Sequence, residues 1–235
     1  MTALSARRYS ASDSRRPLAQ GEVQIWLCAR AVSTDSDSFL RDLLSRFTGL
    51  APLDQRIGRG ECGKPFLLDR RYPLEFSLSH SGDWIACALA CSTPLGLDLQ
   101  ICKPDRQVMR LARRYFSEAE CSALTAVEGE ARTQLFYDLW ALKEARVKAL
   151  GSALGRELEN TGFHIDHGRD GLPLITPNFS SKSAYYALVQ ALPGYALALC
   201  RLQEIPEPPL VRLFTLDESA RERELPVSLR ASSHC

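Results

Sequence analysis

Glu144 and Lys148 are the two residues whose types and spacing most directly suggest chemistry. They lie four residues apart in a segment of strongly helix-forming composition, FYDLWALKEARVKAL at 136–150, and Trp140 lies four residues before them. Residues four apart share one stripe of an α-helix, so a carboxylate and an ammonium group can reach the same ligand. Taken alone, a Glu–Lys pair at this spacing is more often a solvated salt bridge, so the pair needs support from elsewhere in the chain.

Asp98 supplies that support. It is the single acid in the alternating stretch LGLDLQ at 95–100, where the leucines share one strand face and Gly96, Asp98 and Gln100 share the other. An unpaired carboxylate in a buried strand is costly, and a bound metal ion would remove that cost. Mg²⁺ commonly binds through one or two carboxylates together with phosphate oxygens and water. The simpler alternative is that Asp98 lies at a strand end and binds nothing.

Two further segments in the same half carry groups suited to phosphate. The stretch FSLSHSG at 76–82 places Ser79 and His80 at a predicted turn, and a glycine-rich stretch at 58–65 contains Lys64. A strand acid, a helix acid, a lysine one turn on and a Ser-His turn are together the groups that a Mg²⁺-dependent phosphate-transfer site needs.

The bulk composition argues against several classes of protein. The 235 residues carry a net charge of +1, with 45% hydrophobic and 24% charged residues, so no global field points to nucleic acid or membrane. No run of 18 apolar residues occurs, and the N-terminus lacks the apolar core of a signal peptide. The eight cysteines form no CxxC pair, and several lie among apolar residues. We therefore expect a soluble, cytoplasmic protein whose reduced cysteines act as small hydrophobic side chains. We also expect a monomer.

Hydrophobic periodicity predicts an α+β protein of two lobes. The first half has the pattern of a strand, a helix and three strands, at 22–31, 39–50, 76–78, 84–90 and 95–99. The second half has the pattern of two helices and three strands, at 106–116, 133–150, 163–165, 185–192 and 195–201. With a hinge at Cys102–Pro104, we predict a disordered leader at 1–20, an N-terminal lobe at 21–102, a C-terminal lobe at 103–205 and a peripheral tail at 206–235.

Three other patterns suggest rival functions, and each lacks a required part. The segment Gly58–Lys64 fits a P-loop motif, but Pro65 stands at the Ser/Thr position and no helix-forming sequence follows. The stretch HIDH at 164–167 offers three metal ligands and no fourth. Ser79-His80 suggests a hydrolase, but the G-x-S-x-G motif is absent.

The ordered set of motifs resembles one family. The stretches FSLSHSG, LGLDLQ, RRYFSEAE and LWALKEARVKALG follow one another between residues 76 and 151, and GKP at 63–65 precedes them. In this order and at these separations they closely resemble the Sfp-type 4′-phosphopantetheinyl transferases. Each motif is moderately specific, and the ordered set is highly specific.

The resemblance implies an activity and roles for the acids and lysines described above. These enzymes move the phosphopantetheine arm of coenzyme A onto a serine of an acyl, peptidyl or aryl carrier protein and release 3′,5′-ADP. Their fold is two pseudo-symmetric α/β lobes with the coenzyme between them. By position, Asp98 and Glu144 would hold Mg²⁺, with Gln100 or water completing the set. Glu144 would also be the base for the carrier serine, Lys148 would neutralise phosphate charge, and Lys143 would assist or orient.

The same resemblance implies contacts to the coenzyme and the carrier. Lys64, Ser79 and His80 would contact phosphates of coenzyme A, and Glu120 would assist near the metal or the pantetheine arm. One helix face carries arginines that would suit an acidic carrier surface, and a merely solvated basic face is the equal alternative. These arginines are Arg106, Arg110, Arg113 and Arg114.

Two departures from the family pattern keep a second interpretation open. Members of this class usually have a second acid where this chain has Gln100, and a longer basic segment where this chain has the short, slightly acidic stretch AVSTDSDS at 31–38. Arg41, Arg46 or Arg59 would have to replace the missing basic contacts. The alternative is therefore a non-catalytic or weakly active relative that binds coenzyme A or carrier proteins.

Overall fold

The computed structural model describes residues 18–33, 35–104, 107–152, 158, 161–166, 172–179, 183–202, 208–216 and 221–233. The leader predicted at 1–20 lies outside the described residues except for its last three positions. No helix in the described part of the chain is long and apolar enough to cross a membrane.

The described residues contain thirteen strands, four α-helices and one 3₁₀-helix. The first part of the chain forms β1 (Glu22–Ala29), α1 (Ser36–Thr48), η1 (Pro52–Asp54), β2 (Ile57–Arg59), β3 (Pro65–Leu67), β4 (Leu74–Ser81), β5 (Trp84–Cys91) and β6 (Leu95–Ile101). Three helices follow, α2 (Val108–Tyr115), α3 (Glu118–Thr125) and α4 (Gly129–Leu150). The remaining strands are β7 (Phe163–Asp166), β8 (Leu174–Pro177), β9 (Ala184–Gln190), β10 (Tyr195–Leu202), β11 (Leu210–Leu216), β12 (Glu222–Leu225) and β13 (Ser228–Ser232).

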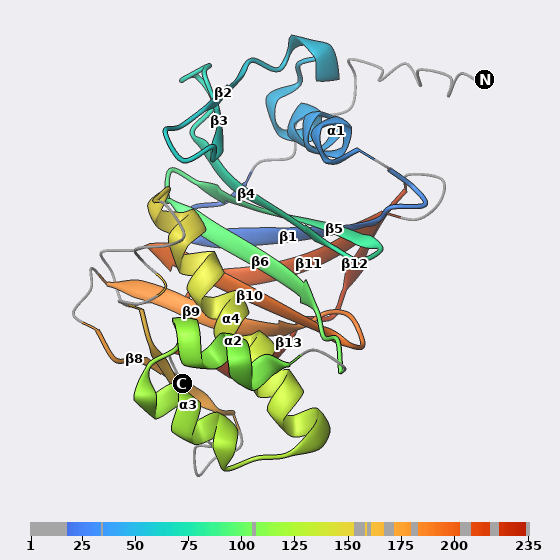
Figure 1. Cartoon of the computed structure of the whole chain (residues 1–235). Coiled ribbons are helices and arrows are strands. Elements are labelled where there is room, and N and C mark those ends of the chain that lie inside the picture. Colours follow the sequence, from blue (N-terminus) through green and yellow to red (C-terminus); the bar gives the residue numbers. More distant parts are fainter. Residues whose placement is uncertain are drawn as a thin grey trace.

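Two large sheets pack face to face, which confirms the α+β class and the two lobes. One has the order β12-β11-β1-β5-β4 and the other β6-β10-β9-β13-β8-β7, while β2 and β3 form a separate hairpin. The outer face of the first sheet is covered by α1, and that of the second by α2, α3 and α4 (Figure 1). Between the sheets lie leucines of β6 and β10 against alanines of β5, and these small side chains allow the sheets to approach closely.

Local capping residues explain where α1 begins and where α1 and α4 end; both helices border the site described below. Asp35 caps the start of α1 by accepting hydrogen bonds from the amides of Asp37 and Ser38, and Gly49 ends the helix in the left-handed region at φ 73°. Gly151 ends α4 in the same way at φ 65°. The sequence predicted α4 correctly, although it begins four residues earlier than expected, and it missed α3 altogether.

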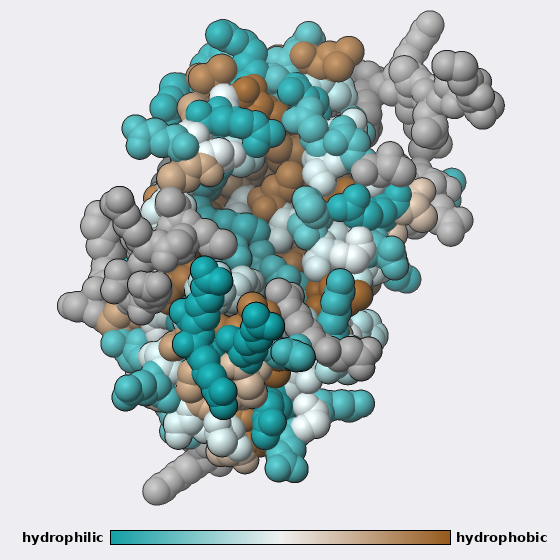
Figure 2. Space-filling view, in the orientation of Figure 1, coloured by the Kyte–Doolittle hydropathy of each residue, from teal (hydrophilic) through white to brown (hydrophobic). Residues whose placement is uncertain are grey.

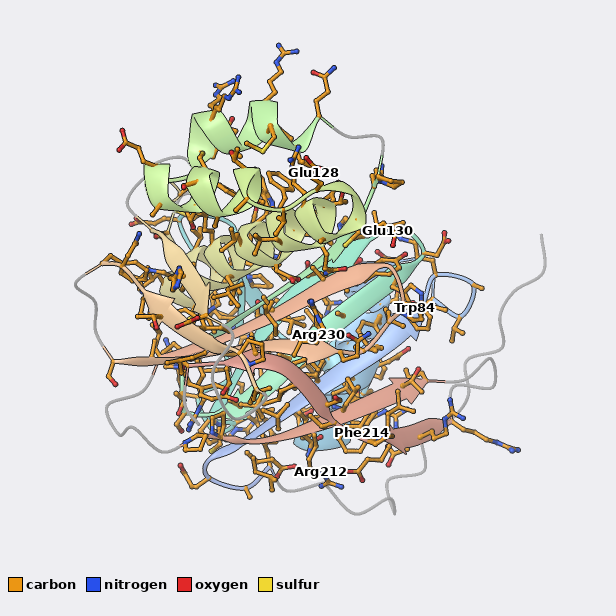
Figure 3. The ribbon with its side chains drawn as sticks, turned by 90° about the horizontal axis from the view of Figure 1, so that it is seen from below. Trp84, Glu128, Glu130, Arg212, Phe214 and Arg230 are labelled. Carbon is orange, nitrogen blue, oxygen red and sulfur yellow. The ribbon has the colours of Figure 1, made fainter. Side chains whose placement is uncertain are left out.

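The C-terminal segment is not a peripheral tail, so that prediction was wrong. Strand β11 pairs with β1 in parallel, with Glu22 opposite Leu210, and β13 pairs with β9 within the second sheet. Arg230 on β13, which is labelled in Figure 3, makes a bidentate ion pair with Asp138 on α4. The last strand therefore also holds the long helix. The segment pairs with strands far away in the sequence, and local periodicity does not reveal such partners.

The predicted lobe boundary and the predicted Ser-His turn also need correction. Strand β6, which was placed in the N-terminal lobe, pairs with β10 and forms the edge of the second sheet. His80 and Ser81 belong to β4, and the turn follows at Gly82, which has φ 54°. Strand β4 forms the edge of the first sheet. Because β5 belongs to the first sheet and β6 to the second, the chain crosses between the sheets after β5.

Candidate active site

A cleft of about 800 Å³ opens between the α1 end of the molecule and the C-terminal end of α4. Figure 2 shows this face hollowed between the two halves, with apolar side chains inside the hollow. Its polar lining comes from β4, α4, the start of α1 and the β2–β3 hairpin, and includes Asp37, Arg59, Lys64, His80, Glu144 and Lys148. Four of the residues predicted from the sequence therefore lie in one cleft.

Strand β6 carries the buried Asp98, and serines of β4 bind its outward-facing amides. The amide N–H of Leu97 donates to Ser77 Oγ at 2.9 Å, and that of Ile101 donates to Ser81 Oγ at 2.9 Å. Between them, the N–H of Leu99 donates to Ser79 Oγ at 3.1 Å. Hydroxyl groups at alternate positions of one edge strand thus replace the backbone acceptors that a neighbouring strand would supply.

Two lysines bind outward-facing carbonyls of the same strand. Lys148 Nζ donates to Leu97 O at 3.1 Å, and Lys64 Nζ donates to Leu95 O at 3.0 Å. Lys64 also lies 3.4 Å from Ala149 O, near the C-terminal end of α4, where a positive charge is favourable. Burial lowers the pKa of Lys64. In this structure its ammonium group therefore links β6 to α4, and its predicted contact to a coenzyme phosphate stays a prediction.

Gly96 allows α4 to lie directly on β6. A Cβ atom at this position would overlap the backbone carbonyl of Ala145 and crowd the amide of Ala149. The missing side chain therefore brings the helix within reach of Asp98, two residues further along the same strand face. The glycine of the LGLDLQ stretch is as much a part of the site as its aspartate.

Asp98 and Lys148 form the central ion pair of the site. Lys148 Nζ lies 2.7 Å from Asp98 Oδ1, with the Asp98 side chain 2% exposed and that of Lys148 27% exposed. Gln100 donates from its amide nitrogen to Asp98 Oδ2 at 2.9 Å. Gln100 therefore orients the carboxylate, and its predicted role as a metal ligand stays a prediction.

Glu144 faces the same group of residues from α4. Burial and, after it, the negative charge of Asp98 raise its pKa to about 7, while Lys148 and a hydrogen bond with the Trp140 side chain oppose the shift. A carboxyl group with a pKa near neutrality can accept or release a proton under ordinary conditions. The prediction that Asp98, Glu144 and Lys148 lie close together is therefore confirmed by the ion pair and by the effect of both charges on Glu144.

Lys143 and Glu120 are not in the cleft, so their predicted roles at the coenzyme or the metal are corrected. The two are paired at 3.0 Å, with side chains 1% and 0% exposed. Lys143 also donates to the carbonyl of Leu158, and Glu120 accepts from the amide of Phe163 and closes the capping box at the start of α3. Burial lowers the pKa of Lys143, and the charge of Glu120 opposes that shift. This pair ties α3 and α4 together inside the second lobe.

The described residues contain no group of three or more His, Cys, Asp or Glu side chains that could hold a metal ion. A divalent cation here would take two carboxylates from the chain, Asp98 and Glu144. That donor set suits Mg²⁺, which keeps several of its sites for water and phosphate oxygens. Burial and, after it, the charge of Asp98 raise the pKa of Glu144, and a cation beside the two carboxylates would offset both effects.

Comparison with known proteins identifies relatives of this chain. A model of the 4′-phosphopantetheinyl transferase superfamily matches residues 94–200, a range that contains Asp98, Glu144 and Lys148. The chain is 34% identical over 164 residues to the 4′-phosphopantetheinyl transferase Sfp of Bacillus subtilis (strain 168), which covers 70% of each chain. The chain belongs to the 4′-phosphopantetheinyl transferase superfamily.

One further relative and one solved structure complete the comparison. It is 38% identical over 113 residues to the 4′-phosphopantetheinyl transferase AcpT of Salmonella typhi, covering 48% of this chain and 57% of that relative. A holo-(acyl-carrier-protein) synthase from Bacillus anthracis in complex with CoA matches with a TM-score of 0.41 and 20% identity, covering 48% of this chain and 96% of that one.

Gly96→Ala should separate α4 from β6. We expect the Tm to fall by about 2–10 °C, because overpacking of this kind costs about 1–3 kcal/mol in a domain of this size. Thermal unfolding measures the effect, and Gly60→Ala is the control, since its new Cβ would lie 3.7 Å from Lys64 O, an ordinary contact. Equal losses in the two variants would contradict the close approach at Gly96.

Glu144→Gln should stabilise the metal-free protein at alkaline pH. The folded-state pKa of about 7 exceeds the ordinary 4.5, so Glu144 makes folding less favourable as the pH rises between these values. At pH 8 we expect the Tm of the variant to exceed that of the wild type by about 2–4 °C, the shift that about 1 kcal/mol produces. The two Tm values should converge at pH 5.

The exposed Glu128, at the start of the same helix (Figure 3), provides the control for this measurement. Because the Glu128 side chain is exposed, Glu128→Gln should change the Tm little at either pH. A Glu144→Gln variant that behaved in the same way would show that Glu144 is not held in a charge-disfavouring environment.

Proposed function

We propose that this protein transfers the 4′-phosphopantetheine arm of coenzyme A to a serine of an apo carrier protein and releases 3′,5′-ADP. The proposal rests on the meeting of Asp98, Glu144 and Lys148: the buried acid of an edge strand pairs with Lys148 and lies near Glu144, and these two residues of α4 line the cleft. The relationship to the transferases supports it.

The roles of the residues follow from their surroundings. Glu144 is the base that accepts the proton of the carrier serine, because its pKa of about 7 suits proton transfer near neutrality. Lys148 lies at the cleft wall with a partly exposed side chain, and its positive charge opposes the negative charge of a diphosphate. His80 is exposed at the rim, where it can contact a phosphate group.

We propose that Asp98 and Glu144 hold Mg²⁺ during the reaction. The support is the chemistry of the donor set, two oxygen ligands whose like charges disfavour each other. When bound, the ion would neutralise charge on the diphosphate and on its leaving group. Asp98 keeps its orientation through Gln100, and α4 keeps Glu144 opposite it.

We propose that an acidic surface of the carrier protein docks on α2. Arg110, Arg113 and Arg114 are exposed on this helix, and Figure 2 shows strongly hydrophilic side chains over it. Arg106, the fourth arginine of the predicted face, lies outside the described residues.

We also propose that the active unit is a monomer in the cytoplasm. Both walls of the cleft come from one chain, which supports a monomer. The seven described cysteines are free, which suits a reducing, cytoplasmic compartment.

A non-catalytic relative that only binds coenzyme A or carriers is the second candidate. Gln100 in place of a second acid, and the acidic rim formed by Asp35 and Asp37, favour it. The retained Glu144 and Lys148 oppose it, because a binding protein has no need of a proton acceptor at the cleft.

Incubation with coenzyme A, Mg²⁺ and a panel of apo carriers, followed by weighing the carriers, tests the two candidates. We expect at least one carrier to gain the mass of phosphopantetheine. Glu144→Gln and Asp98→Ala should each lower the rate at least about 100-fold, the scale typical of losing a general base or a charge-stabilising group. Gln100→Ala should lower it far less.

Tight binding of coenzyme A without any gain of carrier mass would favour the second candidate instead. A loss in Gln100→Ala as large as that in Asp98→Ala would contradict the assignment of the carboxylate pair as the main metal ligands.

A further inference from the structure

Ser79 differs from its two neighbours on the serine-bearing edge of β4. All three serines accept an amide hydrogen bond from β6, but Ser79 also contacts the ion pair of the site. Its hydroxyl donates to Asp98 Oδ1 at 2.9 Å and accepts from Lys148 Nζ at 3.0 Å. Ser79 therefore takes part both in the contact between β4 and β6 and in the hydrogen bonds around the Asp98–Lys148 ion pair.

The hydrogen-bonding capacity of the Ser79 hydroxyl is fully used by the protein itself. A serine hydroxyl offers one donor and two acceptor positions. The donor is taken by Asp98, and the two acceptor positions are taken by the Leu99 amide and Lys148. The residue is also 6% exposed, so its hydroxyl presents no free donor to a phosphate group in the cleft.

We propose that Ser79 is a positioning residue, which holds Lys148 and Asp98 in place for the transfer reaction instead of contacting the coenzyme. This inference rests on the proposed function. It replaces the phosphate contact expected of Ser79 from the sequence.

Hydrogen bonds to its ammonium group are needed to hold the Lys148 side chain in one conformation. The side chain is long and flexible, and ordering it has a substantial entropic cost. Ser79 Oγ, Asp98 Oδ1 and Leu97 O together surround the Lys148 ammonium group. Because Ser79 also binds the Leu99 amide, the position of the lysine becomes coupled to the register between β4 and β6.

A double-mutant cycle separates positioning from direct contact. Ser79→Ala should lower kcat/KM for the transfer about 10- to 100-fold, the range expected for hydrogen bonds to charged groups. In a Lys148→Met background, the same change should lower it by less than about threefold, because residues that act through one another are not additive. Additive losses would overturn the proposal, since a serine that contacts the coenzyme directly acts independently of Lys148.

Ser81→Ala is the matched control, because it removes one edge hydrogen bond without touching the ion pair. It should lower kcat/KM by less than about threefold in both backgrounds, on the same additivity argument. A loss in Ser81→Ala equal to that in Ser79→Ala would mean that the edge bond alone matters, and would overturn the proposal.

The same cycle on urea unfolding of the protein without ligand gives a readout that does not depend on activity. The changes in unfolding midpoint should be non-additive for Ser79→Ala with Lys148→Met and additive for Ser81→Ala with Lys148→Met. Additivity in both pairs would show that Ser79 and Lys148 do not interact, and would overturn the proposal. A wild-type protein that transfers nothing while the coupling persists would overturn the proposed function alone.

Discussion

Strand β6 is at the edge of the six-stranded sheet, and the outward-facing groups of its backbone have to be satisfied. Serines of β4 bind its amides, and Lys64 and Lys148 bind its carbonyls. The two sheets are therefore joined through side chains, and three of these, Ser77, Lys64 and Lys148, also line the cleft. A lysine that completes the edge of the strand is at the same time the cation of the proposed site.

The close packing of α4 on β6 has both structural and chemical consequences. With Gly96 under the helix, Glu144 and Lys148 lie beside the buried Asp98, and burial together with the charge of Asp98 holds the pKa of Glu144 near neutrality. A carboxyl group in this position makes folding less favourable at high pH and gives the cleft its proton acceptor. Such an exchange of stability for reactivity is common at active sites.

The sequence was most informative where local spacing decides the geometry. The turn-by-turn spacing of Glu144 and Lys148 and the alternation around Asp98 predicted the core of the site, because helix and strand periods fix which residues share a face. Lys143 is adjacent to Glu144, and its side chain is buried against Glu120 inside the second lobe. Its neighbouring position in a motif therefore did not indicate a shared role.

Long-range pairing was the part that the sequence did not reveal. The partners of β11 and β13 lie far away in the chain, so the strands of the last segment were taken for a tail. The serines at 77, 79 and 81 were visible as an alternating pattern, but only the neighbouring edge of β6 gives that pattern its meaning.

Amide hydrogen exchange of β6 in the wild-type protein tests whether serine hydroxyls join the two sheets. We expect the amides of Leu97, Leu99 and Ile101, although they face outward from an edge strand, to exchange as slowly as amides in the centre of the sheet, because serine hydroxyls bind them. Rapid exchange at these three positions would show that the serines do not join the sheets, and the arrangement of Asp98, Lys148 and Glu144 that depends on this joint would not hold.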